Sequence, residues 1–295
     1  MVNRTRGGMR MGYAAGVLAL ALLPTADGSL CYGSNAMYSQ DRWVLANSEP
    51  SGKYHPSSRP HHRLFYLDLA ANEPECHSNT VRLERADWAG VCVEPNPQIT
   101  PRLRARRNCT LVEAPIAATE REVTFLPIGE IGGIVGQHMN HASNAKNLRG
   151  ITMKTRRLED VLDSVGAPRH IDYFSLDVEG AEDEVLSDSF PFGRYKFLLL
   201  TVEQPPPPLN ARLFAHGYLW VMNRHDAESF YVHPLHPKAT QLGAQNSSFR
   251  QVPAKCNDER KKATAKRRGV GVDDLIALGY SGKNRYGRCD WTDYE

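Results

Sequence analysis

Two acidic side chains, Asp177 and Glu179, stand where they could take part in chemistry. They follow an apolar run that begins at Ile171, and an amphipathic pattern starts directly after them. This order describes one strand–loop–helix step of an open α/β sheet, in which ligands bind past the carboxyl ends of the strands. Acid–x–acid spacing in an extended segment puts both side chains on one face, where they could accept a proton or hold a metal ion. The alternative is that they are surface acids that favour the positive end of the next helix.

Polar positions also follow the ends of two earlier apolar runs. Residues 88–93 form a short run that ends on Glu94, and Asn96 stands between two prolines that prevent the strand from continuing. A carboxylate at such a strand end can accept hydrogen bonds from both hydroxyls of a ribose. Residues 64–69 indicate an earlier strand, which runs through Asp68 into a loop of small residues that lets backbone amides approach a ligand. Three strand ends with polar groups together predict a nucleotide-type site.

The elements that must position these side chains alternate between strand and helix patterns. Residues 78–86 supply a helix between the first two strands, and the apolar spacing after Thr155 predicts another helix, which Gly166 and Pro168 end. Further strands are expected at residues 110–117, 122–128, 197–203, 217–221 and 229–233, the last two as an antiparallel pair. This alternation predicts an α/β protein.

Three features of the sequence allow two interpretations each. Glu203 is either a further carboxylate of the site or a cap of the helix expected at residues 209–216. Residues 138–149 have little apolar periodicity and form either a mobile flap over the site or an ordinary insertion. Residues 98–107 form a basic helix whose arginines, ending with Arg107, are expected to make a solvated face, with contact to an acidic substrate as the alternative.

Taken together, these residues resemble the FkbM-type methyltransferases, a family that depends on S-adenosylmethionine. The matching segments, in the family's order, are residues 68–72, 78–80, 83–84, 88–97, 131–136, 171–182, 195–197, 201–203 and 216–218. The resemblance implies one α/β domain over residues 38–234. It also implies a Rossmann-like, seven-stranded class I methyltransferase sheet with helices on both faces.

The same resemblance implies roles for the polar positions. Those that would hold the cofactor S-adenosyl-L-methionine, by its methionine part or its ribose, are Asp68, Ala70, Asn72, Glu94 and Asn96. Asp177 and Glu179 would lie beside the methyl-accepting group. Methyl transfer is an in-line displacement, and a hydroxyl acceptor must also lose its proton. Asp177 would therefore act as base or metal ligand, with Glu179 as its support or substrate contact. A divalent metal at this site is the alternative way to stabilise the charge of the acceptor, and the sequence does not establish one. The expected reaction is oxygen methylation of a sugar or other small hydroxylated acceptor.

One departure from the family pattern concerns the first loop, where Ala70 and Pro74 replace two glycines. An alanine is tolerated there if its φ is negative, whereas a positive φ would cost of order 1 kcal/mol. Some eukaryotic members share this loop, and their subgroup is similar to the animal protein Star, a secretory-pathway factor that exports growth-factor precursors. The alternative function is therefore a non-catalytic trafficking or cargo-export factor with a methyltransferase fold.

Composition and the N-terminal residues bear on partners and location. The formal net charge of the 295 residues is +3, which is too small to indicate nucleic-acid binding. Arginines before an apolar stretch at residues 11–23, with small residues after it, predict that residues 1–28 are a secretory signal peptide. The stretch is shorter than the roughly 20 residues of a spanning helix, which favours a cleaved signal peptide. The alternative is a short signal anchor of a type II membrane protein. The expected location is the secretory pathway, in the endoplasmic reticulum or Golgi lumen or outside the cell.

The C-terminal segment and the cysteines add further expectations. Residues 235–295 form a basic, partly disordered tail, with contact to an acidic glycan or a membrane surface as the alternative. The six cysteines fit an oxidising compartment, and Cys92 and Cys109 are expected on neighbouring strands, either bonded or as buried free thiols. Glycosylation sequons begin at Asn108 and Asn246, and the first lies at a strand start, where it is expected to be inaccessible.

Overall fold

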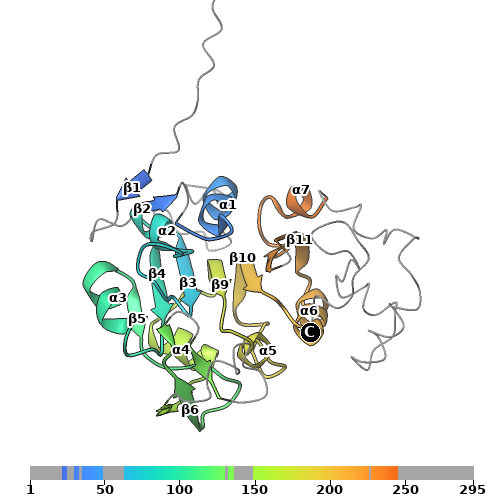
Figure 1. The fold of residues 1–295 in the computed structure, drawn as a ribbon. Coiled ribbons are helices and arrows are strands. Elements are labelled where there is room, and N and C mark those ends of the chain that lie inside the picture. Colours follow the sequence, from blue (N-terminus) through green and yellow to red (C-terminus); the bar gives the residue numbers. More distant parts are fainter. Residues whose placement is uncertain are drawn as a thin grey trace, which may run out of the picture.

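A seven-stranded sheet organises the protein (Figure 1). The computed structural model describes residues 22–24, 30–32, 35–48, 63–129, 132–135, 149–225 and 227–244. In spatial order the strands are β11 (Leu219–Arg224), β12 (Glu228–Val232), β10 (Lys196–Glu203), β9 (His170–Leu176), β3 (Phe65–Leu69), β4 (Ala89–Val93) and β5 (Thr110–Val112). Strand β12 is antiparallel to both of its neighbours, and the pairs from β10 to β5 are parallel. The predicted seven-stranded sheet and its terminal antiparallel pair are therefore confirmed.

Both faces of this sheet are buried, which is why its central strands read as continuous apolar runs. Along β3, Leu67 and Leu69 belong to one core cluster and Tyr66 to the other. The helices that contribute to the first cluster are α4 (Leu158–Ser164), α5 (Glu182–Val185) and α6 (Pro207–Ala215). Those of the second are α1 (Gln40–Asn47), α2 (Val81–Arg85), α3 (Thr100–Arg106) and α7 (Ala239–Ala244). The expected helices on both faces are confirmed.

The order of the strands creates a topological switch point between β3 and β9. From β3 the chain adds β4 and then β5 on one side, whereas β9 and β10 lie on the other side. The connections leave β3 and β9 in opposite directions, and in open α/β sheets this opens a crevice at the carboxyl ends of the strands. Asp68 lies in β3 and Asp177 follows β9, so they stand on either side of this point.

Smaller antiparallel sheets accompany the central one. The strand expected at residues 122–128 is β6 (Glu122–Leu126), which pairs with β7 (Gly133–Ile134) and β8 (Ile151–Lys154). Strands β1 (Leu22–Pro24) and β2 (Leu30–Tyr32) form a separate pair. Strand β5 ends at Val112, earlier than expected, and Pro115, which has no backbone N–H to donate, follows it.

Several predictions concern residues outside the described ranges. These are most of the signal peptide, residues 138–148 of the flap, the sequon at Asn246 and residues 245–295 of the tail. The described beginning of the tail segment contains α7, which packs on β11 and buries Leu242. No helix in the described part of the chain is long and apolar enough to cross a membrane.

Candidate functional site

A cavity opens at the carboxyl ends of β3, β4, β9 and β10. Its volume is about 190 Å³, whereas a single water needs roughly 10–15 Å³, so the space suits a ligand rather than a trapped water. The sequence-predicted site residues all line it: Asp68, Ala70, Asn72, Glu94, Asn96, Asp177 and Glu179. Among the described residues of its wall there is no lysine or arginine. The cavity therefore carries negative charge.

Glu94 forms a buried anionic end of this cavity, directly after β4. Its two carboxylate oxygens accept backbone N–H groups of Asn72 at 2.9 Å and Asn96 at 2.8 Å. Burial raises the pKa of Glu94 to about 7, the charge of Asp68 adds to the rise, and the two backbone hydrogen bonds oppose it. Because a carboxylate oxygen has more than one acceptor position, each oxygen can also accept a hydrogen bond from a ligand in the cavity.

The side chain of Asn96 is occupied by the protein itself. Its amide nitrogen donates to the carbonyl of Gly129 at 2.9 Å, and its amide oxygen accepts the backbone N–H of Gln98 at 2.9 Å. Asn96 is buried and forms part of the cavity wall. Its contribution is to hold the Gly129 turn against the end of β4.

The loop after β3 folds although it lacks the glycines of the family pattern. Ala70 and Asn72 both have left-handed backbones, with φ of 58° and 48°. The backbone N–H of Ala71 donates to the carbonyl of Val93 at 3.1 Å, which ties the loop to β4. The positive φ of Ala70 settles the question that the sequence left open, at a cost of order 1 kcal/mol of strain.

Asp68 is buried beneath this loop and takes part in a polar network. The hydroxyl of Thr80 donates to its carboxylate at 2.5 Å, and Arg107 donates to the same hydroxyl at 2.8 Å. Burial raises the pKa of Asp68, while Arg107 and the hydrogen bonds oppose the rise. Arg107 also donates to Glu84 at 3.0 Å and to the hydroxyl of Tyr66 at 3.2 Å.

The expectation that Arg107 belongs to a solvated face was wrong. Its side chain is 1% exposed. The residue stands at the C-terminal cap of α3, where the backbone turns extended with φ of −117°, and this turn directs the guanidinium inward rather than along the exposed helix face. The charge pattern of residues 98–107 does not predict the inward direction of the Arg107 side chain, because it does not show which arginine lies past the end of the helix.

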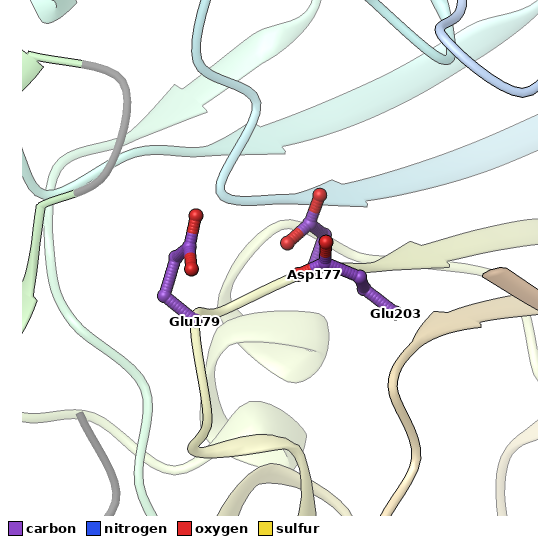
Figure 2. A group of neighbouring side chains, drawn as sticks. All are labelled: Asp177, Glu179 and Glu203. Atoms are coloured by element: carbon purple, nitrogen blue, oxygen red, sulfur yellow. The ribbon is translucent and has the colours of Figure 1, made fainter. Parts of the chain in front are cut away.

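A group of three carboxylates forms the other end of the cavity. Figure 2 shows the carboxyl groups of Asp177 and Glu203 close together, with Glu179 to one side; oxygens of all three lie within 4.8 Å of one another. Burial, then the charge of Glu203, raises the pKa of Asp177 well above its ordinary value. Burial likewise raises the pKa of Glu203 to about 7, against a hydrogen bond from Asp177. The two neighbouring carboxyl groups therefore hold protons more tightly than isolated carboxyl groups do.

The position of Glu203 decides between its two interpretations. The N-terminal cap of α6 is Pro206, and Glu203 is the last residue of β10 and lines the cavity. It therefore belongs to the carboxylate group. Such a group could accept a proton from a hydroxyl, accept hydrogen bonds from several hydroxyls, or hold a cation.

Further acids lie behind this group. Glu182 accepts the backbone N–H groups of Val178 and Gly180, both at 3.1 Å, and so shapes the turn after β9. Glu228 is 1% exposed and is paired in register with Glu203 across β12 and β10. Burial, then the charge of Asp177, raises the pKa of Glu228 to about 8. Glu228 was not expected from the sequence, where its only signal is an acid at the start of a strand that is otherwise mostly apolar.

Residues at the start of α1 and just before it cover the acidic end of the cavity. Met37, Tyr38 and Gln40 line it. Arg224 of β11 donates to the carbonyl of Tyr38 at 3.1 Å, and the ring of Tyr38 lies 5.7 Å from that of His225. The acidic end is therefore covered by residues that come from both termini of the domain, a contact too distant in sequence for spacing to reveal.

Comparison with known families gives one result. A family model described as the methyltransferase FkbM domain matches residues 68–228, which is more than half of the chain. The match begins at Asp68 of the first cavity strand and ends at Glu228 behind the carboxylate group. No curated protein matches the chain.

Proposed function

This chain belongs to the FkbM methyltransferase family, and from that premise we propose that it methylates a hydroxyl oxygen of a sugar or other small hydroxylated acceptor. One observation carries the proposal. A single cavity joins Glu94, which suits a ribose, to the carboxylates of Asp177, Glu179 and Glu203, which suit a hydroxylated acceptor. Methyl transfer requires a cofactor and an acceptor side by side, and this cavity offers a place for each.

The residues present fit S-adenosylmethionine. When bound, this cofactor supplies a methyl group on a positively charged sulfur. Both oxygens of Glu94 can accept ribose hydroxyls while they keep the N–H groups of Asn72 and Asn96. The turn at Ala70 lines the cavity, and the absence of lysine and arginine from the described wall favours a cationic ligand.

Proton transfer falls to the acids at the far end. Burial and the charges of neighbouring acids raise the pKa of Asp177 and of Glu203, so an ionised carboxylate of this pair is a stronger base for the proton of the acceptor hydroxyl than an ordinary one. Glu179 would orient the acceptor through a second hydrogen bond. General base catalysis of this kind contributes about 10²–10⁴-fold to a rate. A divalent cation held by the same three carboxylates is a second way to stabilise the developing charge.

We further propose that the protein works in the secretory pathway. The leader pattern of residues 1–28 supports this, as does the disulfide between Cys92 and Cys109 with a Cα–Cα distance of 5.8 Å. Cys76 is disulfide-bonded as well. Disulfides persist in oxidising compartments and are rare in the cytosol.

The test is calorimetry with the purified protein and S-adenosylmethionine. Wild type should bind with measurable heat, and Glu94→Ala should abolish it because the ribose hydroxyls lose their acceptor. Glu159→Ala, on α4 and outside the cavity wall, is the matched carboxylate control and should bind like wild type. Absence of binding in folded wild type would refute the proposal.

A second candidate is a non-catalytic trafficking or cargo-export factor that keeps the fold. The replaced glycines of the first loop favour it, since the left-handed Ala70 adds strain at the cofactor end. Such a factor would give no heat with S-adenosylmethionine and would co-purify with membrane cargo. The same calorimetry therefore separates the two functions.

A further inference from the structure

We propose that Asn108 is an N-glycosylation site whose glycan projects from the end of the sheet opposite the cavity. Asn108, Cys109 and Thr110 form an Asn-x-Thr acceptor sequence. The proposal rests on the secretory location proposed above, because this modification takes place in the lumen.

The sequon is accessible in the structure, contrary to the expectation from the sequence. Asn108 and Thr110 are both exposed. The reason is their place in the sheet: β5 is an edge strand that pairs only with β4 among the described strands, and Asn108 precedes it in the turn after α3 (Figure 1). The expectation of an inaccessible site was therefore wrong.

The local contacts of Asn108 are compatible with a glycan. Its backbone N–H donates to Glu84 Oε1 at 2.8 Å, and its side-chain Nδ2 donates to the same oxygen at 3.3 Å. The donor would be a lipid-linked oligosaccharide diphosphate. A bond forms between Nδ2 and the anomeric carbon, the bond from that carbon to the diphosphate oxygen breaks, and Nδ2 loses one proton. One N–H remains on Nδ2, so the contact with Glu84 need not be lost.

The middle residue of the sequon does not stand in the way. Cys109 is bonded to Cys92, 17 residues earlier. Oligosaccharide transfer acts on the extended nascent chain, before Cys109 closes onto Cys92 in the folded sheet. After folding, the disulfide holds the turn in the position where Asn108 is exposed.

The direction of β5 separates the glycan from the cavity. The strand runs from Thr110 to Val112, and the residues that line the cavity, Ala114 to Ile116, follow its carboxyl end. Asn108 precedes its amino end. A glycan there would also screen the edge of β5 that no other described strand pairs with, and unpaired edges are where sheets of different molecules associate.

The experiment uses the full chain, expressed in cells with a secretory pathway. Peptide N-glycosidase in heavy-oxygen water converts a glycosylated asparagine to labelled aspartate, and mass spectrometry of the Asn108 peptide detects the label. Thr110→Ala leaves Asn108 in place but should abolish the label, and the protein should migrate faster in electrophoresis by the equivalent of one glycan. Thr110→Ser retains the sequon and should keep the label and the glycan, and Asn246→Gln should leave the Asn108 peptide labelled.

The outcomes distinguish the site from the location on which it rests. An unlabelled Asn108 peptide from protein recovered from the lumen would overturn the glycosylation site and leave the secretory location intact. Protein that stays in the cytosol without any glycan would overturn both. Enzymatic deglycosylation should leave the affinity for S-adenosylmethionine unchanged, and a loss of affinity would contradict a glycan at the end opposite the cavity.

Discussion

Replacement of Arg107 by methionine should destabilise the protein and weaken cofactor binding together. The guanidinium is buried and donates to Glu84, Tyr66, Thr80 and, at 3.1 Å, the hydroxyl of Ser78. Methionine fills a similar volume but offers no donor and no charge. Glu84 and the neighbouring Asp68 would then lose the cation that compensates their burial.

The magnitude follows from these contacts. Removal of one partner of a buried ion pair costs about 3–5 kcal/mol, a large part of the roughly 5–15 kcal/mol by which domains are stable. At about 2–4 °C per kcal/mol for a domain of this size, the melting temperature should fall by roughly 6–20 °C. His77 and Asn79, in the loop that Arg107 anchors through Ser78 and Thr80, line the cavity. Affinity for S-adenosylmethionine should therefore drop on the order of tenfold, or about 1.4 kcal/mol.

The loss of stability should also depend on pH. Burial alone would raise the pKa of Glu84, but Arg107 and the hydrogen bonds from Asn108 and Tyr66 lower it below its ordinary value of 4.5. Ionised Glu84 therefore stabilises the wild type above that pH, and the contribution is lost as the pH falls through the lowered pKa. Without Arg107 the carboxylate is a buried charge lacking its counterion. The difference in stability should be largest near pH 8 and smaller near pH 4.

The assay is urea unfolding at both pH values with calorimetry at neutral pH, and Arg212→Met is the control. Arg212 is also largely buried and pairs with Asp183 and Asp188, both at 2.6 Å, but it does not line the cavity. The control should lose stability and keep its cofactor affinity. Equal losses for Arg107→Met at pH 4 and pH 8, or an unchanged affinity, would refute the reasoning.

Four other outcomes are expected. Cofactor affinity should fall up to about tenfold per pH unit as Glu94 gains a proton below about pH 7, and calorimetry of Glu94→Gln should show weak binding without this dependence. Asp177→Asn should lower turnover by about 10²–10⁴-fold while the cofactor affinity stays unchanged, and unchanged turnover would exclude Asp177 as the base. If wild type loses its activity when metal is removed and regains it when Mg²⁺ alone is added, a cation bound by the same carboxylates is favoured instead. Replacing Cys92 and Cys109 by alanine should lower the free energy of unfolding by about 3 kcal/mol, because the disulfide closes a loop of 17 residues. In reducing agent, thermal melts of the wild type and of the variant should differ much less. Ala70→Gly removes the strain of a left-handed alanine with φ of 58° and should change the free energy of unfolding by less than about 1 kcal/mol. Calorimetry should show that the variant still binds S-adenosylmethionine, because glycine adopts the same turn.

Patterns local in the sequence predicted the fold and the residues that the fold brings together around one cavity. The apolar run that contains Asp68 and the two runs that lead to Glu94 and Asp177 are strands buried on both faces, and such strands are recognisable because they are short and continuous. Their acids meet in one cavity because parallel strands share a carboxyl edge, so strand direction alone brought the three positions together.

What the sequence could not reveal depends on contacts between distant residues. The inward turn of Arg107 depends on where α3 ends, and the placement of Glu228 depends on its register with Glu203. Whether Cys92 and Cys109 form a disulfide or remain free thiols depends on the separation of two strands, which spacing does not fix.

Strained backbone conformations in this chain are concentrated around the cavity. Left-handed residues other than glycine cost of order 1 kcal/mol each. Four of those in the described part of the chain line the cavity, namely Ala70, Asn72, His77 and Glu179, and a fifth, Gln204, follows Glu203. A left-handed residue reverses the chain within one position, so a strand can end abruptly and its last carboxylate can face the crevice. The surrounding contacts hold these turns in place, as when Gln204 donates to the carbonyl of Ala227 at 2.6 Å. Strain gathered around one cavity is expected of a site whose shape matters more than its stability. The loop of Ala70 keeps its turn without the glycines because contacts such as the hydrogen bond from Ala71 to Val93 hold it.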